Sequence, residues 1–414
     1  MKTVPIYGHP LLRYRRQVPD TPNATIYRDL GGLDLSSYNY NLNQPFRRAV
    51  TLRFYDTQDI LQAVVSSNAQ YCPILALKWD DLDSGSGSFD LELATDLGLA
   101  HGWRLDIHLW NNQAPAYSGF IQQKPTAGST DRTFKYGGYG GLALLDRVFV
   151  TATYPAQPVS SIANQLARLA EQRVRIQVFD SQIASSSYST LGELKFLRTP
   201  VKQALEQCAQ LAGGYEWGID ANRRFFFRPA PTETDWHGWV GKHLETFVPE
   251  EDSSKIANRI YIKGGKVRGD LAADHPLYKT NWLEDVIEDT DSQALYGVCE
   301  DDFSAPATLN LIDALRAADQ ELKRRAYPRA YARVDGLEFA GTPLSTSGKA
   351  RIVGKGGQQL ILPKKRLRYR LAKGGVTVDA DFGDIDFSAS NTVANLVANA
   401  AAEALSRQNS QRQL

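Results

Sequence analysis

The chain has 414 residues, of which 43% are hydrophobic and 22% charged, and its formal net charge is +1. This length allows two or three packed domains, and the composition is that of a globular protein rather than a disordered or fibrous one. The near-zero net charge argues against a dedicated nucleic-acid or membrane-surface binder, because such proteins carry a pronounced basic excess.

The N-terminal segment differs from the rest of the chain. Residues 1–45 are rich in Pro, Asn, Tyr and Gly and lack sustained periodicity, so we predict an extended N-terminal arm. Prolines 5, 10 and 19 interrupt its start, which does not fit a secretory leader. Since no apolar stretch approaches about 18 residues, we also expect no membrane anchor and a soluble protein.

A first small β-barrel domain is predicted over residues 46–155. Short apolar runs alternate there with Gly, Asn, Pro and Ser, which is typical of short strands joined by turns. The expected strands cover residues 49–56, 60–65, 72–79, 89–94, 102–110, 117–125 and 131–140, although the second of these could also be a short helix. Asp80, Asp81 and Asp83 follow the third strand; they lack the ligand spacing of a calcium loop, so we interpret them as a solvated turn.

A mixed helical and β segment is predicted over residues 156–250. Apolar residues at helical spacing indicate a helix at 160–172, and Thr199 with Pro200 at the first turn indicates a second helix at 200–212. The glycines that end the second helix lead into a hairpin with its turn at residues 220–222.

A second β-barrel domain is predicted over residues 251–385. It begins with a strand near residue 258, contains a helix at 308–326 that is ended by Pro328, and continues in short strands separated by Gly turns. Residues 386–414 are expected to form a C-terminal helix and a polar tail. The predicted fold is therefore mainly β with inserted helices (α+β): two small tube-like β-barrels and a mixed α/β middle segment.

No catalytic, cofactor or metal site is expected. The three cysteines, Cys72, Cys208 and Cys299, are odd in number and far apart, without neighbouring histidines at a ligand spacing, so we predict buried free thiols in a reducing cytoplasm. No catalytic signature accompanies any histidine or carboxylate, and the Gly pairs lack the context of a phosphate loop. We expect that the protein is not an enzyme.

Two groups of residues are candidates for interfaces. Arg366, Arg368 and Arg370 alternate with apolar residues, which places them on one face of a strand, where they could contact a partner, passing DNA or only solvent. Trp236 and Trp239 lie close to His237 and His243, and we favour a loop that packs its tryptophans at an interface. With Asp235 and Glu245 nearby, the alternative is a carbohydrate-binding or carbohydrate-active protein.

The order of these elements resembles that of the tail-hub and baseplate-hub proteins of tailed bacteriophages. The hubs of contractile injection systems belong to the same family. The resemblance is carried by Gly119 and Phe120, by the step at Tyr136, Gly137, Tyr139 and Leu144, and by the two helices, the hairpin and the strand after it. It extends over residues 45–380 as an arrangement of elements, and no single motif in it is specific.

The resemblance implies a virion structural protein that forms a homotrimer. Two similar β domains in each of three subunits would give six nearly equivalent positions, on which a hexameric tail tube docks, with the three-fold spike or fibre on the other face. Its partners would be the tail tube protein, the spike or fibre and other baseplate proteins, with DNA passing through the lumen without sequence-specific binding. It would assemble in the host cytoplasm and reside in the virion tail, with a contractile injection system hub as the alternative.

Overall fold

The chain folds into two lobes, which we describe from a computed structural model. The structure describes residues 2–6, 14–18, 23–28, 39–41, 50–67, 72–109, 114–125, 133–186, 188–253, 255–266, 274–276, 282–337, 345–354, 359–372 and 375–383. The predicted C-terminal helix at 386–414 lies outside these residues. Within them, no helix is long and apolar enough to cross a membrane.

Four short strands come first, in the segment where we predicted an extended arm. They are β1 (Lys2–Ile6), β2 (Tyr14–Val18), β3 (Asn23–Arg28) and β4 (Asn39–Asn41). Neighbouring strands pair antiparallel in the order β1-β2-β3-β4, as a sheet of their own.

The β lobe is built on a long curled sheet that combines the first and the last strands of the chain. Its early strands are β5 (Val50–Tyr55), β6 (Leu61–Ser66), β7 (Ile74–Leu82), β8 (Gly85–Leu93), β9 (Arg104–Leu109), β10 (Tyr117–Gln123) and β11 (Phe134–Gly140). Its late strands are β17 (Thr234–Trp239), β18 (Thr246–Asp252), β22 (Arg329–Asp335), β23 (Lys349–Val353), β24 (Gln359–Ala372) and β25 (Gly375–Gly383). The sheet runs β18-β22-β25-β24-β7-β8-β11-β10-β9-β5-β6, so β24 and β7 join its two halves.

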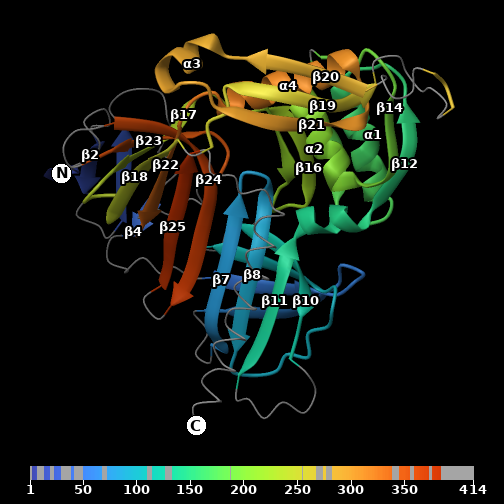
Figure 1. Ribbon diagram of the computed structural model, residues 1–414. Helices are drawn as coiled ribbons and strands as arrows, with labels where there is room; N and C mark the ends of the chain where they lie inside the picture. Colours follow the sequence, from blue (N-terminus) through green and yellow to red (C-terminus); the bar gives the residue numbers. More distant parts are fainter. Residues whose placement is uncertain are drawn as a thin grey trace, which may run out of the picture.

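Figure 1 shows this junction: the red strands β24 and β25 lie beside the blue strands β7 and β8. Residues 329–383 of the predicted second β domain therefore share one sheet with the predicted first β domain, whereas the strands within residues 259–310 form a separate sheet. The regions that share the long sheet also share one core, because buried residues between Val50 and Tyr136 pack in the same cluster as buried residues between Leu244 and Phe382. The alternation of buried and partly exposed residues along β5 explains why the strand periodicity was readable.

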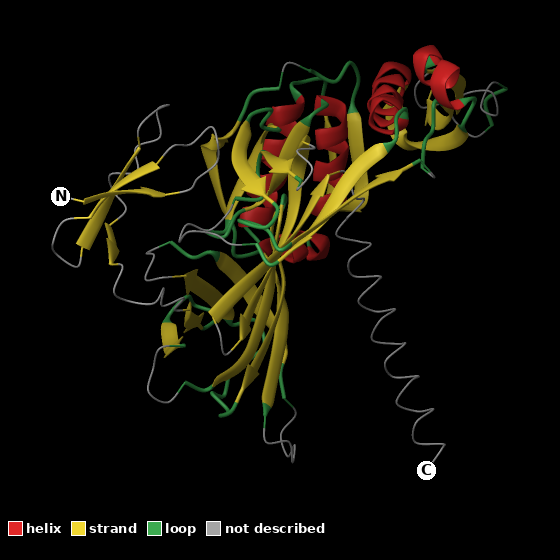
Figure 2. Ribbon diagram, turned by 90° about the vertical axis from the view of Figure 1, so that its left-hand side faces the viewer, coloured by secondary structure: helices red, strands yellow, loops and turns green. Residues whose placement is uncertain are grey.

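The α/β lobe holds the helices. Its first part contains η1 (Gly141–Arg147), β12 (Phe149–Tyr154), α1 (Val159–Glu171), β13 (Gln177–Ile183), β14 (Leu194–Pro200), α2 (Val201–Ala212), β15 (Tyr215–Ile219) and β16 (Arg224–Pro229). Its second part contains β19 (Arg259–Lys266), β20 (Trp282–Glu288), α3 (Thr290–Tyr296), β21 (Glu300–Asn310) and α4 (Leu311–Arg325). Figure 2 shows the helices gathered above the β lobe.

The helices of this lobe pack through small and aliphatic side chains. Ile162, Leu166 and Ala170 of α1 are fully buried, and so are Leu205 and Cys208 of α2. Strand β20 pairs antiparallel with β19, and β21 pairs parallel with it, so the order in this three-stranded sheet is β20-β19-β21. The helices at 160–172, 200–212 and 308–326 and the hairpin turn at 220–222 are confirmed within a few residues.

The tip of the β7–β8 hairpin connects the two lobes. The amide of Ile219, at the end of β15, donates to the carbonyl of Ser84 (2.9 Å), and Ile219 also lies opposite Gly85 in a parallel bridge. Gly85 has φ = +111°, and a Cβ atom there would lie 1.7 Å from the carbonyl oxygen of Ile219. Only glycine fits this position, because it tolerates positive φ and leaves room for the neighbouring backbone.

Candidate functional site

The basic residues of β24 lie at the junction of β24 with β7 and β25. Leu367 and Tyr369 point into the core, whereas Arg366, Arg368 and Arg370 are partly or largely exposed, so the predicted separation of the two faces is confirmed. We call this contact between the two halves of the sheet the β7–β24 junction; it comprises β7, β24 and β25.

Each of the three arginines forms an ion pair with a carboxylate of a neighbouring strand. Arg366 binds Asp80 of β7 at 2.7 Å. Arg368 binds Asp381 at 2.6 Å and Arg370 binds Asp379 at 3.2 Å, both on β25. The positive charge of β24 is therefore largely matched within the chain, so this face offers little excess charge to DNA. Contact of these arginines with a partner stays a prediction.

The buried face of the same junction is apolar and aromatic. The rings of Trp79 on β7 and Tyr369 on β24 stack with their centroids 4.8 Å apart and their planes parallel. Both side chains are at most 2% exposed. Ion pairs on one face and an aromatic stack on the other hold the two halves of the sheet in a fixed register.

The acidic run 80–83 is not the solvated turn that we predicted. Asp80 and Asp81 belong to β7, and only the short turn at residues 83–84 separates β7 from β8. Asp83 forms an ion pair with Lys365 at 2.8 Å. The acidic run thus pairs with basic residues of β24 across the sheet. Local composition does not reveal such a cross-strand pairing. In the described part of the chain, no cluster of three or more His, Cys, Asp or Glu could hold a metal ion.

Asp81 is the member of this run whose carboxyl pKa is raised by its surroundings. Burial, with repulsion from Asp83 and Asp80, raises the pKa of its carboxyl to about 8. The folded state therefore holds a proton that the unfolded state has released between roughly pH 4 and pH 8. As a result, the contribution of Asp81 to stability falls as the pH rises through this window.

We expect Asp81→Asn to raise the free energy of unfolding at pH 9 and to leave it nearly unchanged at pH 4, because the amide stays neutral at both pH values. Urea unfolding at the two pH values measures the difference. The comparison variant is Asp83→Asn, which removes both the ion pair with Lys365 and the repulsion of Asp81, and is therefore expected to change stability at pH 9 less than Asp81→Asn does. An equal effect of Asp81→Asn at both pH values would contradict the burial of this carboxyl.

The predicted aromatic group near residue 236 packs against the sheet. The ring of Trp236 lies nearly parallel to that of Phe382, with centroids 5.9 Å apart, and the ring of Trp239 lies 6.1 Å from that of His243. The carboxylate of Asp235 binds Lys364, whose side chain is only 3% exposed, at 2.7 Å. These contacts give Trp236 and Asp235 structural roles and weaken the carbohydrate alternative. An interface role for Trp236 and Trp239 stays a prediction.

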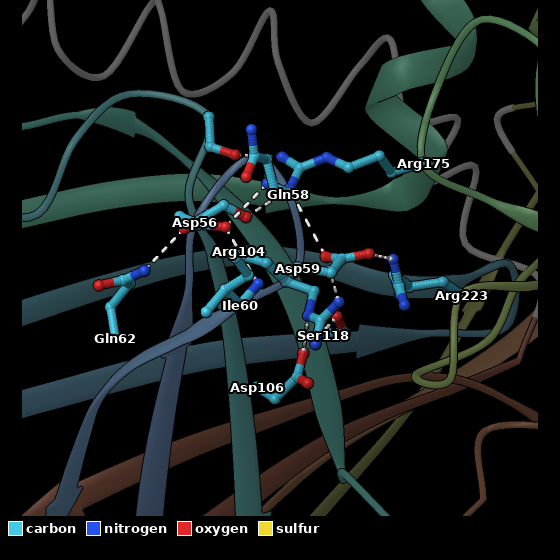
Figure 3. A network of polar contacts seen from close by, with 11 residues as sticks. Asp56, Gln58, Asp59, Ile60, Gln62, Arg104, Asp106, Ser118, Arg175 and Arg223 are labelled. Carbon is cyan, nitrogen blue, oxygen red and sulfur yellow. Dashed lines mark hydrogen bonds and ion pairs between the residues drawn. The ribbon is translucent and has the colours of Figure 1, made fainter.

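A second charged cluster, which the sequence did not reveal, joins the lobes at Asp59 (Figure 3). Asp59 lies in the turn between β5 and β6, and its carboxylate binds Arg104 of β9 at 2.5 Å. It also binds Arg223 of the β15–β16 turn at 3.0 Å and lies 3.6 Å from Arg175, which follows α1. One carboxylate thus connects three guanidinium groups from two lobes.

The surroundings of this Asp59 cluster fix the three arginines further. Arg104 also contacts Asp106 at 3.1 Å, and its guanidinium lies 3.9 Å from the centre of the Tyr55 ring. Arg175 donates to the carbonyl of Asp56 at 3.0 Å and lies 4.6 Å from the centre of the Phe120 ring. Burial and repulsion from the neighbouring arginines lower the pKa of Arg175, and the nearby carboxylates oppose this shift. The Asp59 cluster is therefore a structural connection between the two lobes.

The fold is similar to that of known tail proteins. The 43 kDa tail protein of prophage MuSo2 from Shewanella oneidensis superposes with a TM-score of 0.59 at 12% identity, over 81% of this chain and 98% of that one. The tail protein from Neisseria meningitidis MC58 superposes with a TM-score of 0.56 at 13% identity, over 81% of this chain and 95% of that one. No family model and no curated protein matches the sequence.

Proposed function

Starting from a fold shared with phage tail proteins, we propose that this chain is a structural protein of a tailed-phage tail, and that it forms its trimeric hub. The main support is the extent of the likeness, which covers nearly the whole of both tail proteins and includes both lobes of this chain. The charged groups support a scaffold as well, since the β7–β24 junction and the Asp59 cluster use their ionised side chains to join parts of the fold.

In this role the chain acts by geometry rather than by catalysis. Two halves of a sheet held in fixed register present two β surfaces per subunit, so a trimer would offer six to a hexameric tail tube. The three-fold spike or fibre and the other baseplate proteins would occupy the remaining faces, and DNA would pass through the centre. The protein would assemble in the host cytoplasm and remain in the virion.

Negative-stain electron microscopy of the purified protein tests this proposal. We expect particles with three-fold symmetry and an open centre, because a tube must continue through the hub. Compact particles without symmetry at every concentration would contradict it. The substitution Trp79→Ala removes the stacking contact with Tyr369 and is expected to reduce the fraction of ring-shaped particles. The control is Leu75→Ala, at a half-exposed position of the same strand.

A further inference from the structure

Helix α3 lies at the outer end of the α/β lobe (Figure 1), and exposed apolar side chains lie on it and next to it. Leu295 is 69% exposed, Val298 53%, and Tyr296 and Tyr327 are each 43% exposed. The two tyrosine rings contact each other edge to face, with centroids 6.3 Å apart. We call these four residues the α3 patch. Large apolar side chains gathered at one exposed site mark a binding surface more often than single exposed ones do.

The chain around the α3 patch is strongly acidic. Residues 282–303 contain eight Asp and Glu residues and no Lys or Arg. Four of these carboxylates form ion pairs: Arg259 binds Glu288 at 2.6 Å and Glu300 at 3.0 Å, Lys263 binds Asp302 at 2.7 Å, and Arg325 binds Asp301. Among the described residues, the exposed Asp291 forms no ion pair, and the exposed Glu284 lies opposite Lys263, which binds Asp302. The α3 patch therefore suits a partner that is both apolar and basic.

A buried asparagine holds the α3 patch in place. Asn258 is fully buried, and its side-chain amide donates to the carbonyl of Gly297 at 2.7 Å. Its side-chain oxygen accepts from the amide of Cys299 at 2.8 Å, and Asp289 caps the start of α3 by accepting from the amide of Ser292 at 2.9 Å. The exposed side chains are thus presented on a fixed backbone, which lowers the entropy cost of binding.

The first residues of the chain have the complementary chemistry. Residues 1–19 contain Lys2, Arg13, Arg15 and Arg16 and no acidic residue, with two leucines and two tyrosines among the basic positions. Figure 2 shows the N-terminal strands at one end of the molecule and the sheet that carries α3 at the opposite end. A contact between these two surfaces therefore joins different copies more readily than it closes within one.

We propose that the α3 patch binds the basic N-terminal segment, residues 1–19, of a second copy of this chain. Such a contact is heterologous, because two different surfaces meet, and it closes into a ring when the rotation between copies allows. This inference rests on the proposed hub and adds to it a contact that links each subunit to the next. Apolar burial on the α3 patch supplies affinity, and the opposite charges supply orientation and selectivity.

Charge reversal on both sides, in the full-length chain, tests this contact. One variant is R13E/R15E/R16E, and the other is E284R/D285R/D291R. The matched control, E193R/E233R/E245R, reverses three exposed carboxylates elsewhere. Sedimentation velocity over a range of protein concentrations, at low and at high salt, gives the dissociation constant for self-association of each variant.

We expect each reversal to weaken self-association at least tenfold at low salt, and the combined six-fold variant to recover most of that loss. The control triple is expected to match the unmodified chain. If the unmodified chain and all variants are trimers of equal stability, the contact is overturned and the proposed hub stands. If the unmodified chain is a monomer at every concentration, both are overturned. Loss in both triples without recovery in the combination would also overturn the contact.

Discussion

Replacing Trp79 by alanine is expected to lower the free energy of unfolding by about 3–5 kcal/mol, the range for removal of a large buried aromatic side chain. Trp79 is 1% exposed and stacks on Tyr369 across the β7–β24 junction, so the variant removes apolar contacts from both halves of the sheet. Urea unfolding followed by far-UV circular dichroism measures the loss.

Two further variants sharpen this prediction. The indole N–H of Trp79 has no hydrogen-bond partner among the described residues, so Trp79→Phe loses volume without losing a hydrogen bond and is expected to cost less than half as much. Leu75→Ala, on the same strand at a position that is 50% exposed, should cost less than about 1 kcal/mol. A similar loss in all three variants would show that the stack does not hold the junction.

Replacing Asp59 by asparagine is expected to lower the free energy of unfolding by about 2 kcal/mol, because it leaves Arg104, Arg175 and Arg223 close together without their shared carboxylate. Asparagine keeps the side-chain shape and tolerates the positive φ of 62° at this position. The loss should remain largely unchanged at high salt for the partly buried pair with Arg104. Thermal unfolding at two salt concentrations measures it.

The control for Asp59 is Glu193→Gln. Glu193 pairs with Lys195 at 3.4 Å on the surface, where both side chains are largely exposed, so its loss should cost less than about 1 kcal/mol. If Asp59→Asn costs no more than this control, the three arginines do not depend on the shared carboxylate, and the lobes are held together by other contacts.

Much of the secondary structure was predictable from the sequence because its signals are local. Pro200 at the start of α2 and Pro328 after α4 mark helix ends, and the alternation along β24 assigned Arg368 and Tyr369 to opposite faces. These features depend on neighbours within a few positions. The resemblance to phage hub proteins rested on the order of these local signals along the chain. The similarity of the fold to known tail proteins supports this resemblance.

The candidate site was less predictable because its contacts are distant in sequence. Asp80 and Arg366 are 286 positions apart, and Asp59 and Arg223 are 164 apart. Nothing near Asp80 distinguishes a carboxylate in a solvated turn from one paired across a sheet, which explains the wrong interpretation of the acidic run. Trp236 was identified by its aromatic character, but its partner Phe382 is set by the register of β25, which the sequence pattern does not specify.

The mass of the purified protein in solution, measured by multi-angle light scattering, tests the proposed hub most directly. We expect a species of three times the 46.0 kDa of one chain at concentrations above the dissociation constant for self-association. A species with the mass of one chain at all concentrations would contradict the trimeric hub.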